Sequence, residues 1–203
     1  MRKYIIVAVL ATFALGVYFF SNSSPIIKNY PPKNDTIVAF GDSLTRGVGA
    51  TDGKGFVYLL SQKLGKPIVN LGVSGDTTKE GLARINEAIK KNPGTVVLLL
   101  GGNDYLKKVP QEETFNNLRQ IITKFQSGGS MVVLLGVRGG VLSDKFEKPF
   151  ENLARETGSI YVSDVLSGVI TKKEYMYDTV HPNDEGYAII ADRIYQKVAK
   201  YIK

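Results

Sequence analysis

Residues 36–45 of the chain read Thr-Ile-Val-Ala-Phe-Gly-Asp-Ser-Leu-Thr, a short apolar run that ends in glycine and is followed by small polar side chains. A short, continuous apolar run of this kind predicts a strand that is buried on both faces, as in a parallel sheet. The polar residues of the stretch then fall at the carboxyl end of the predicted strand.

Similar runs, most of them rich in β-branched residues, recur along the chain at residues 68–71, 96–100, 131–135 and 160–162. Segments with the 3.6-residue period of a helix lie between them, and the last of these segments spans residues 187–202. This alternation predicts an open α/β sheet with right-handed crossovers. In such a sheet, functional residues gather at the carboxyl ends of the strands.

Two helix starts are also predicted. Thr77 and Glu80 have the spacing of a capping box, and residues 183–185 read Asn-Asp-Glu, which is typical of a helix N-terminus. The length of 203 residues favours a single domain that is large enough to bury its own core.

The chain contains no cysteine and one histidine, His181. These counts exclude disulfides, a cysteine nucleophile, an iron–sulfur cluster and zinc sites built from cysteines or several histidines. A metal held by carboxylates and carbonyls stays open at this point. Any chemistry that needs an imidazole must use His181.

The net charge is +7, from 26 Lys and Arg against 19 Asp and Glu. The lysines are scattered along the chain and do not alternate with aromatic residues on one helix. We therefore expect a solvated basic surface and no nucleic-acid partner.

The first 24 residues differ from the rest. Arg2 and Lys3 precede an uncharged, mostly apolar stretch over residues 4–20, and residues 21–24 are polar. This pattern predicts that residues 1–24 are a signal peptide or an N-terminal membrane anchor, with a buried core helix as the structural alternative. Residues 25–35 are predicted to be a linker. A signal peptide or an anchor would place the rest of the chain in the periplasm or outside the cell, or anchored by residues 4–20 to the outer face of the cytoplasmic membrane.

Four polar clusters follow the predicted strands or precede the last helix, at residues 41–45, 72–76, 101–104 and 178–183. Other catalytic motifs fail: the chain has no Gly-x-Ser-x-Gly elbow, phosphate loop or dinucleotide fingerprint. In order and position, the four clusters resemble the consensus blocks of the SGNH hydrolases, the GDSL family of esterases, lipases and thioesterases. The resemblance covers roughly residues 36–202. Within the family, the chain is similar to the small bacterial branch that includes the arylesterases and lysophospholipase L1-like enzymes.

The resemblance implies a three-layer α/β/α, flavodoxin-like fold with a central parallel sheet of about five strands, and a hydrolase domain over residues 36–203. It implies no metal and no other cofactor. It also implies that Ser43 is the nucleophile, that His181 is the base and that Asp178 orients the histidine, with Ser43, Gly72 and Asn103 as oxyanion donors.

These roles are chemically reasonable. A serine hydroxyl needs an imidazole to take its proton, and a carboxylate can hold the other ring N–H. Gly72 has no side chain to obstruct a developing oxyanion, and Asn103 offers an amide NH₂. Each residue also has a structural alternative: Ser43 as a helix cap, His181 as a structural histidine, Asp178 as a solvated carboxylate and Asn103 as a turn residue. The joint occurrence of these four residues favours a catalytic site. Asp42 is assigned no catalytic role and is expected to bond loop N–H groups.

The substrate is expected to contact Tyr105, Leu106, Arg138 and Val141, which follow the third and fourth predicted strands. Their mixture of apolar and cationic side chains would suit an acyl chain with an anionic headgroup, or the cations simply solvate the rim. We expect a serine esterase that acts on acyl or aryl esters, lysophospholipids among them. The alternatives are an O-acetyl esterase for cell-envelope or exogenous glycans, an acyl thioesterase, a membrane-surface adaptor and a degenerate module that binds acylated glycans. The sequence does not indicate an oligomeric state.

Overall fold

A five-stranded parallel sheet forms the centre of the protein in the computed structural model, which describes residues 26–139 and 145–202. The strands lie in the order β2-β1-β3-β4-β5, and every neighbouring pair is parallel. Their bounds are β1 Ile37–Gly41, β2 Ile68–Gly72, β3 Thr95–Leu99, β4 Met131–Leu135 and β5 Ile160–Val162. The predicted parallel α/β sheet is confirmed, and each strand lies within one residue of its apolar run.

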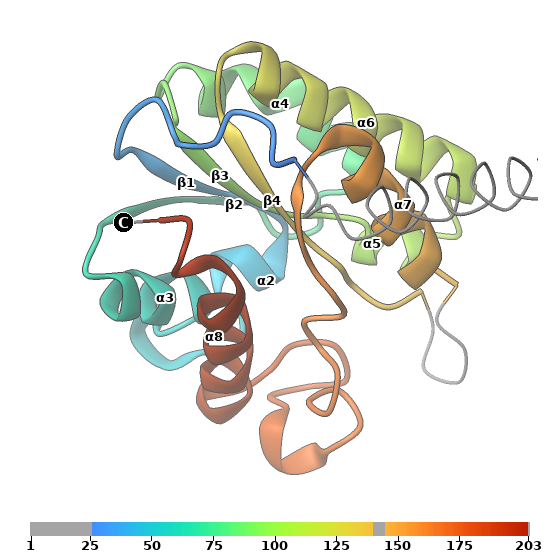
Figure 1. Ribbon diagram of the computed structural model, residues 1–203. Helices are drawn as coiled ribbons and strands as arrows, with labels where there is room; N and C mark the ends of the chain where they lie inside the picture. Colours follow the sequence, from blue (N-terminus) through green and yellow to red (C-terminus); the bar gives the residue numbers. More distant parts are fainter. Residues whose placement is uncertain (1–25, 140–144, 203) are drawn as a thin grey trace, which may run out of the picture.

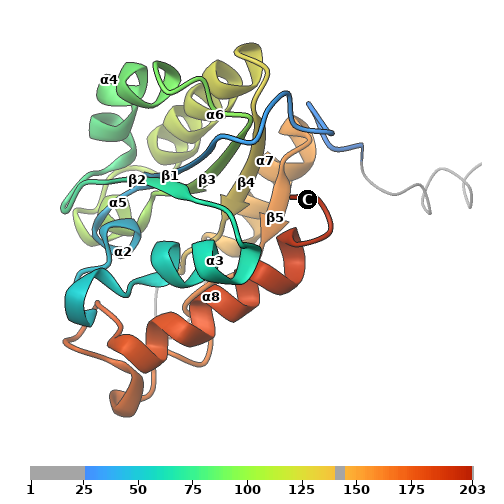
Figure 2. The same cartoon turned by 90° about the vertical axis from the view of Figure 1, so that its left-hand side faces the viewer.

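Helices cover both faces of this sheet and complete the predicted three-layer fold (Figures 1 and 2). One face carries α4 (Thr78–Ile89), α6 (Gln111–Ser127) and α7 (Glu147–Thr157), and the other carries α3 (Phe56–Leu64) and α8 (Asp184–Val198). The short elements are α2 (Ser43–Arg46), α5 (Gly102–Leu106) and the 3₁₀ turns η1 (Thr51–Gly53) and η2 (Lys173–Tyr175).

The core lies on both sides of the central strands. Every residue of β1, β3 and β4 is buried, whereas the edge strand β2 is only partly covered. Burial on two faces explains why the central strands read as continuous apolar runs rather than alternating ones. Both predicted helix starts are present: Thr77 and Glu80 form a capping box on α4, and the Asn183 side chain accepts the Gly186 N–H at 3.0 Å.

Residues 26–35 form an irregular segment of turns and bends, here called the amino-edge strap, that contains no helix or strand. It lies against loops at the amino ends of the strands. The Lys28 N–H donates to the Gly158 carbonyl at 2.9 Å, and the Asn29 amide donates to the carbonyls of Gln126 and Ser130 at 2.8 and 3.0 Å. The Lys66 ammonium lies 2.7 Å from Asp35. The strap is therefore bonded to the domain at the end of the sheet where the strands begin, opposite their carboxyl ends.

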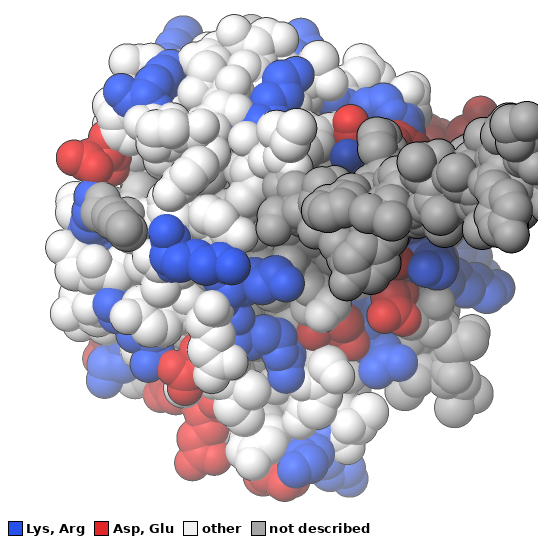
Figure 3. Space-filling view, in the orientation of Figure 1, with Lys and Arg blue, Asp and Glu red and all other residues white. Residues whose placement is uncertain are grey.

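Residues 1–24, for which the signal or anchor is predicted, lie outside the described residues. Within residues 26–139 and 145–202, no helix is long and apolar enough to cross a membrane. On the face in Figure 3, Lys and Arg side chains lie among Asp and Glu side chains and uncharged surface.

Candidate active site

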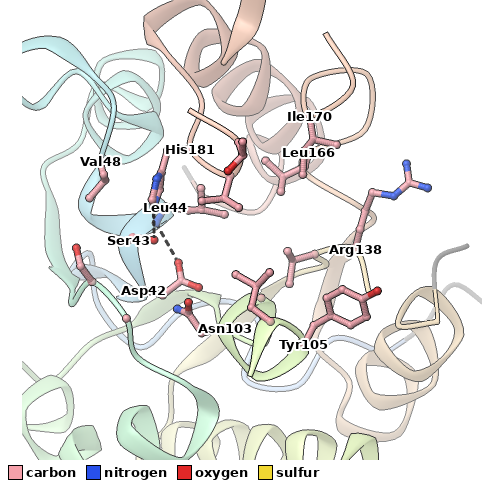
Figure 4. Close-up of a pocket in the computed structure, with 17 residues that line it drawn as sticks. Asp42, Ser43, Leu44, Val48, Asn103, Tyr105, Arg138, Leu166, Ile170 and His181 are labelled. Carbon is pink, nitrogen blue, oxygen red and sulfur yellow. Dashed lines mark hydrogen bonds between the residues drawn. The ribbon is translucent and has the colours of Figure 1, made fainter. Parts of the chain in front are cut away.

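The carboxyl ends of the strands converge on one cavity of about 370 Å³ (Figure 4). Ser43 begins α2 directly after β1, and Asn103 lies in α5 shortly after β3. His181 comes from the loop that precedes α8. Three segments far apart in the sequence thus place their polar side chains at one end of the sheet.

Ser43, His181 and Asp178 form a continuous chain of hydrogen-bonding groups. The Nε2 atom of His181 lies 3.0 Å from the Ser43 Oγ, and its Nδ1 lies 2.7 Å from an Asp178 carboxylate oxygen. The other carboxylate oxygen accepts the backbone N–H groups of Val180 and His181 at 2.8 and 2.7 Å. The Asp178 carboxylate therefore stabilises the turn over residues 178–181. This turn brings the carboxylate to the His181 ring, three residues later in the sequence.

The charge state of Asp178 determines which ring nitrogen of His181 carries the proton. Burial alone would raise the pKa of Asp178, but hydrogen bonds from the His181 ring and from two backbone N–H groups outweigh it and lower the pKa. An ionised carboxylate only accepts hydrogen bonds, so the neutral ring places its proton on Nδ1. Nε2 then presents a lone pair to the Ser43 hydroxyl, which is the arrangement of a general base and its nucleophile.

Gly72 does not lie at this cavity, which corrects the sequence-based assignment. It is the last residue of β2, and its N–H donates to the side-chain oxygen of Asn70 at 2.9 Å. A Cβ at this position would lie 2.2 Å from the Arg46 nitrogen, so the glycine allows β2 and α2 to approach closely. Gly72 therefore has a packing role, and its N–H is already occupied.

Gly75 lines the cavity instead, in a left-handed backbone conformation with φ of +87°. Its N–H and that of Ser43 have no acceptor within residues 26–139 and 145–202. The amide nitrogen of Asn103 donates to the Asp76 carbonyl at 2.8 Å, which orients the amide and leaves its second N–H for another acceptor. The sequence carried a signal for Gly75, because a glycine in the loop after a predicted strand permits this conformation.

Asp42, beside the nucleophile, is buried, and one of its oxygens accepts the Leu44 N–H at 3.0 Å. This bond agrees with the structural role expected for it. Burial raises the pKa of Asp42 from 3.8 to about 7, although the Leu44 N–H and the charge of His181 act in the opposite direction.

The raised pKa predicts a stability change in Asp42→Asn. The unfolded chain releases the Asp42 proton near its ordinary pKa of 3.8, whereas the folded chain retains it up to about 7. The carboxyl therefore disfavours folding progressively across that interval, by up to about 4 kcal/mol for a shift of roughly three units. Because asparagine keeps the acceptor for Leu44 without the charge, Asp42→Asn is expected to gain stability relative to the parent as pH rises.

Urea unfolding at several pH values between about 5 and 8 measures this difference. Asp192→Asn, which removes an exposed carboxylate paired with Lys63, is the matched control. A stability difference between Asp42→Asn and the parent that does not change with pH would contradict the prediction.

The cavity extends from Ser43 along mostly apolar walls. Tyr105 and Leu106 line it and are exposed. Arg138 also lines it, but its guanidinium points away from Ser43 and lies 3.6 Å from Asp164 (Figure 4). Val141 lies outside the described residues. Further lining residues that the sequence analysis did not select are Val48, Ser74, Val137, Leu166, Ile170, Thr179 and Val180.

No group of three or more His, Cys, Asp or Glu residues within the described part of the chain is placed to hold a metal ion. A serine, a histidine and an aspartate in contact at the carboxyl edge of a parallel α/β sheet have the geometry of a serine hydrolase.

The chain belongs to the GDSL-like lipase/acylhydrolase family, whose model matches residues 39–189. It is 30% identical to an arylesterase of Vibrio mimicus over 83% of this chain and 90% of the relative. It is also 30% identical to the thioesterase 1/protease 1/lysophospholipase L1 of Escherichia coli, over 78% of this chain and 80% of that protein. The protein is therefore an enzyme of the ester hydrolase class, as the sequence resemblance predicted.

Solved structures agree with this assignment. The crystal structure of TesA is 27% identical, with a TM-score of 0.77, and the match covers 82% of this chain and 99% of TesA. The psychrotrophic esterase EstA from Pseudoalteromonas, solved with monoethylphosphonate as inhibitor, is 25% identical with a TM-score of 0.75 over 83% of this chain and 99% of EstA.

Proposed function

We propose that the protein hydrolyses carboxylic esters through an acyl-enzyme intermediate on Ser43. The observation that carries this proposal is the Ser43–His181–Asp178 chain, which opens into a cavity with mostly apolar walls. The apolar walls suit the acyl group of an ester, and the polar atoms are concentrated at the end where the bond would be cleaved.

In the acylation step, the Ser43 Oγ attacks the ester carbonyl carbon while its proton moves to the Nε2 of His181. The carbonyl oxygen becomes negatively charged in the tetrahedral intermediate. The N–H groups of Ser43 and Gly75 and the Asn103 amide are the donors that we assign to this oxygen. The intermediate then collapses, the bond to the alcohol oxygen breaks, and the alcohol leaves with the proton from Nε2.

In the deacylation step, water attacks the acyl carbon of the Ser43 ester and passes a proton to Nε2. The same donors stabilise the second tetrahedral intermediate. When the bond between the acyl carbon and Oγ breaks, Oγ recovers the proton from Nε2 and the carboxylic acid is released. Asp178 holds the imidazolium in both steps and remains ionised, which agrees with its lowered pKa.

Thioester hydrolysis is a second candidate activity, because one relative at 30% identity is named a thioesterase as well as a lysophospholipase. The same attack and the same oxyanion occur with a thioester, and only the leaving atom differs. A non-catalytic module that binds acylated glycans is disfavoured, because Ser43 and His181 are within hydrogen-bonding distance at the cavity.

A fluorophosphonate probe tests the esterase mechanism. We expect the probe to label Ser43 covalently, with loss of p-nitrophenyl acetate hydrolysis in proportion to labelling. Peptide mass spectrometry identifies the labelled residue. Labelling at a residue other than Ser43, or full turnover after complete labelling, would refute the mechanism. A folded protein with neither labelling nor turnover would leave the binding module or the adaptor.

The apolar walls predict a preference for acyl chains longer than acetyl. Each methylene that enters the cavity contributes about 0.8 kcal/mol, so kcat/KM for p-nitrophenyl esters is expected to rise roughly four-fold per added methylene until the cavity is filled. Ile170→Ala should reduce this gain for longer esters while leaving the acetate rate nearly unchanged, because Ile170 lines the cavity and does not contact the Ser43–His181–Asp178 chain. Equal kcat/KM across the series would contradict an acyl-binding role for the cavity.

We also propose that the enzyme is exported and acts outside the cytoplasmic membrane, on the basis of the residue pattern over 1–24. The intact mass of the protein purified from its native host distinguishes a cleaved signal from a retained anchor, which would hold the enzyme at the membrane. A native enzyme found only in the soluble cytoplasmic fraction would refute export. Gel filtration with light scattering of the same sample measures the oligomeric state.

A further inference from the structure

Arg84, on α4, connects two of the loops that border the candidate active site. Its Nη2 donates to the Gly41 carbonyl at 2.9 Å, and its Nε lies 2.5 Å from a carboxylate oxygen of Asp76. Gly41 ends β1 two residues before Ser43, and Asp76 follows Gly75 in the loop after β2. One guanidinium therefore contacts both backbone segments that carry the proposed N–H donors.

Asp76 extends this connection to a third segment, the short helix α5. Its backbone carbonyl accepts the Asn103 amide at 2.8 Å, while its carboxylate is held by Arg84. The Asn103 side chain is thus oriented by the same residue that Arg84 fixes in place. The donors that we assign to the oxyanion come from three separate segments, the start of α2, the loop after β2 and the short helix α5, and Arg84 and Asp76 together contact all three or the residues beside them.

We infer that Arg84 is a positioning residue that holds the oxyanion donors of Ser43, Gly75 and Asn103 at their relative distances. This inference rests on the proposed ester hydrolysis and adds a residue outside the cavity lining to it. Arg84 itself does not line the cavity, so it acts through Gly41 and Asp76 and does not contact the substrate.

The surroundings of Arg84 favour a fixed geometry. Its guanidinium stacks on the Phe40 ring at 4.2 Å from the ring centre, and the side chains of Arg84 and Asp76 are 14% and 9% exposed. A planar guanidinium donates in two fixed directions and stacks on an aromatic face at the same time, which a lysine ammonium does not do. The geometry therefore requires arginine at this position.

Other bonds hold the strands together without Arg84. The Val73 N–H donates to the same Gly41 carbonyl at 2.9 Å, and β1 pairs with β2 along its whole length. Removal of Arg84 should therefore leave the sheet intact and release the Asp76 carboxylate. The expected defect is in the alignment of the donors.

The test compares Arg84→Lys and Arg84→Met with the parent in the full-length chain, with p-nitrophenyl acetate as substrate. We expect kcat to fall about 10²-fold, the typical effect of misplacing catalytic groups by about 1 Å, with KM nearly unchanged. Inhibition by phenylboronic acid, whose adduct with serine places an oxygen where the oxyanion forms, should weaken in parallel. A purely structural role would lower the melting temperature without this coupled loss of kcat and inhibitor affinity.

Arg119→Met is the matched control, because Arg119 forms an exposed pair with Glu156 at 2.8 Å between α6 and α7. It should keep parental kcat and inhibition. Asp76→Asn, which preserves the shape of the side chain, serves if the Arg84 variants do not fold, and it should show the same coupled loss at smaller size.

Folded variants with parental kcat and boronic acid affinity, or a loss of kcat without loss of affinity, would overturn the inference. The proposed function fails separately, if Ser43→Ala retains turnover.

Discussion

Replacing Ser43 with alanine is expected to lower kcat on p-nitrophenyl acetate by about 10⁴-fold or more. The variant loses the only atom that forms the acyl-enzyme, while the N–H donors and the cavity remain. His181→Ala should produce a loss of the same order, because no second imidazole exists in the chain and Nε2 lies 3.0 Å from the Ser43 Oγ. Stopped-flow or steady-state release of nitrophenolate measures both.

The double variant distinguishes a cooperating pair from two independent residues. If Ser43 and His181 act as one unit, then the double variant loses little more than either single variant. Circular dichroism and thermal unfolding confirm that each protein is folded. A folded Ser43→Ala or His181→Ala variant with parental turnover would show that the assignment of the nucleophile or base is wrong.

Asn103→Ala is expected to lower kcat by about 10²–10³-fold with little change in KM. Loss of one oxyanion donor has this effect in serine hydrolases because the donor bonds the oxygen more strongly in the transition state than in the bound ester. The measurement is a full Michaelis–Menten curve for p-nitrophenyl butyrate with the variant and the parent.

Asn117→Ala is the matched control for this prediction. Its side-chain amide is buried and donates to the Thr78 hydroxyl at 3.2 Å, and Asn117 is not among the residues that line the cavity. Asn117→Ala should reduce the free energy of unfolding and leave kcat nearly unchanged. An Asn103→Ala variant whose KM rises while kcat stays constant would indicate a role in substrate binding instead.

The sheet could be predicted from the sequence because the central strands are buried on both faces and therefore appear as continuous apolar runs. The alternation predicts helices where α3 and α7 lie, but it does not predict their bounds. Only a few of their residues are buried, among them Phe56 and Leu60 of α3 and Phe150 and Leu153 of α7. Stripes of two or three buried residues do not define where a helix begins or ends.

The side chains of the candidate site could be selected from the sequence, but one backbone donor could not. Ser43, Asn103, Asp178 and His181 are recognisable by residue type and motif, whereas a backbone N–H carries no residue identity. Gly72 and Gly75 both follow the second apolar run, and only the three-dimensional path shows that the Gly72 N–H is bonded to Asn70. The apolar wall formed by Leu166 and Ile170 comes from a loop after β5 without a regular pattern.

The amino-edge strap determines where on the domain the chain before residue 26 is attached. Because Lys28 and Asn29 are bonded to loops at the amino ends of the strands, the point of attachment lies at one pole of the domain. Ser43 lies at the other pole, because it follows the carboxyl end of β1 and each residue of a strand advances the chain by about 3.3 Å. A domain tethered through the strap would therefore be held by the pole opposite its cavity, which would leave the cavity entrance clear of the tether.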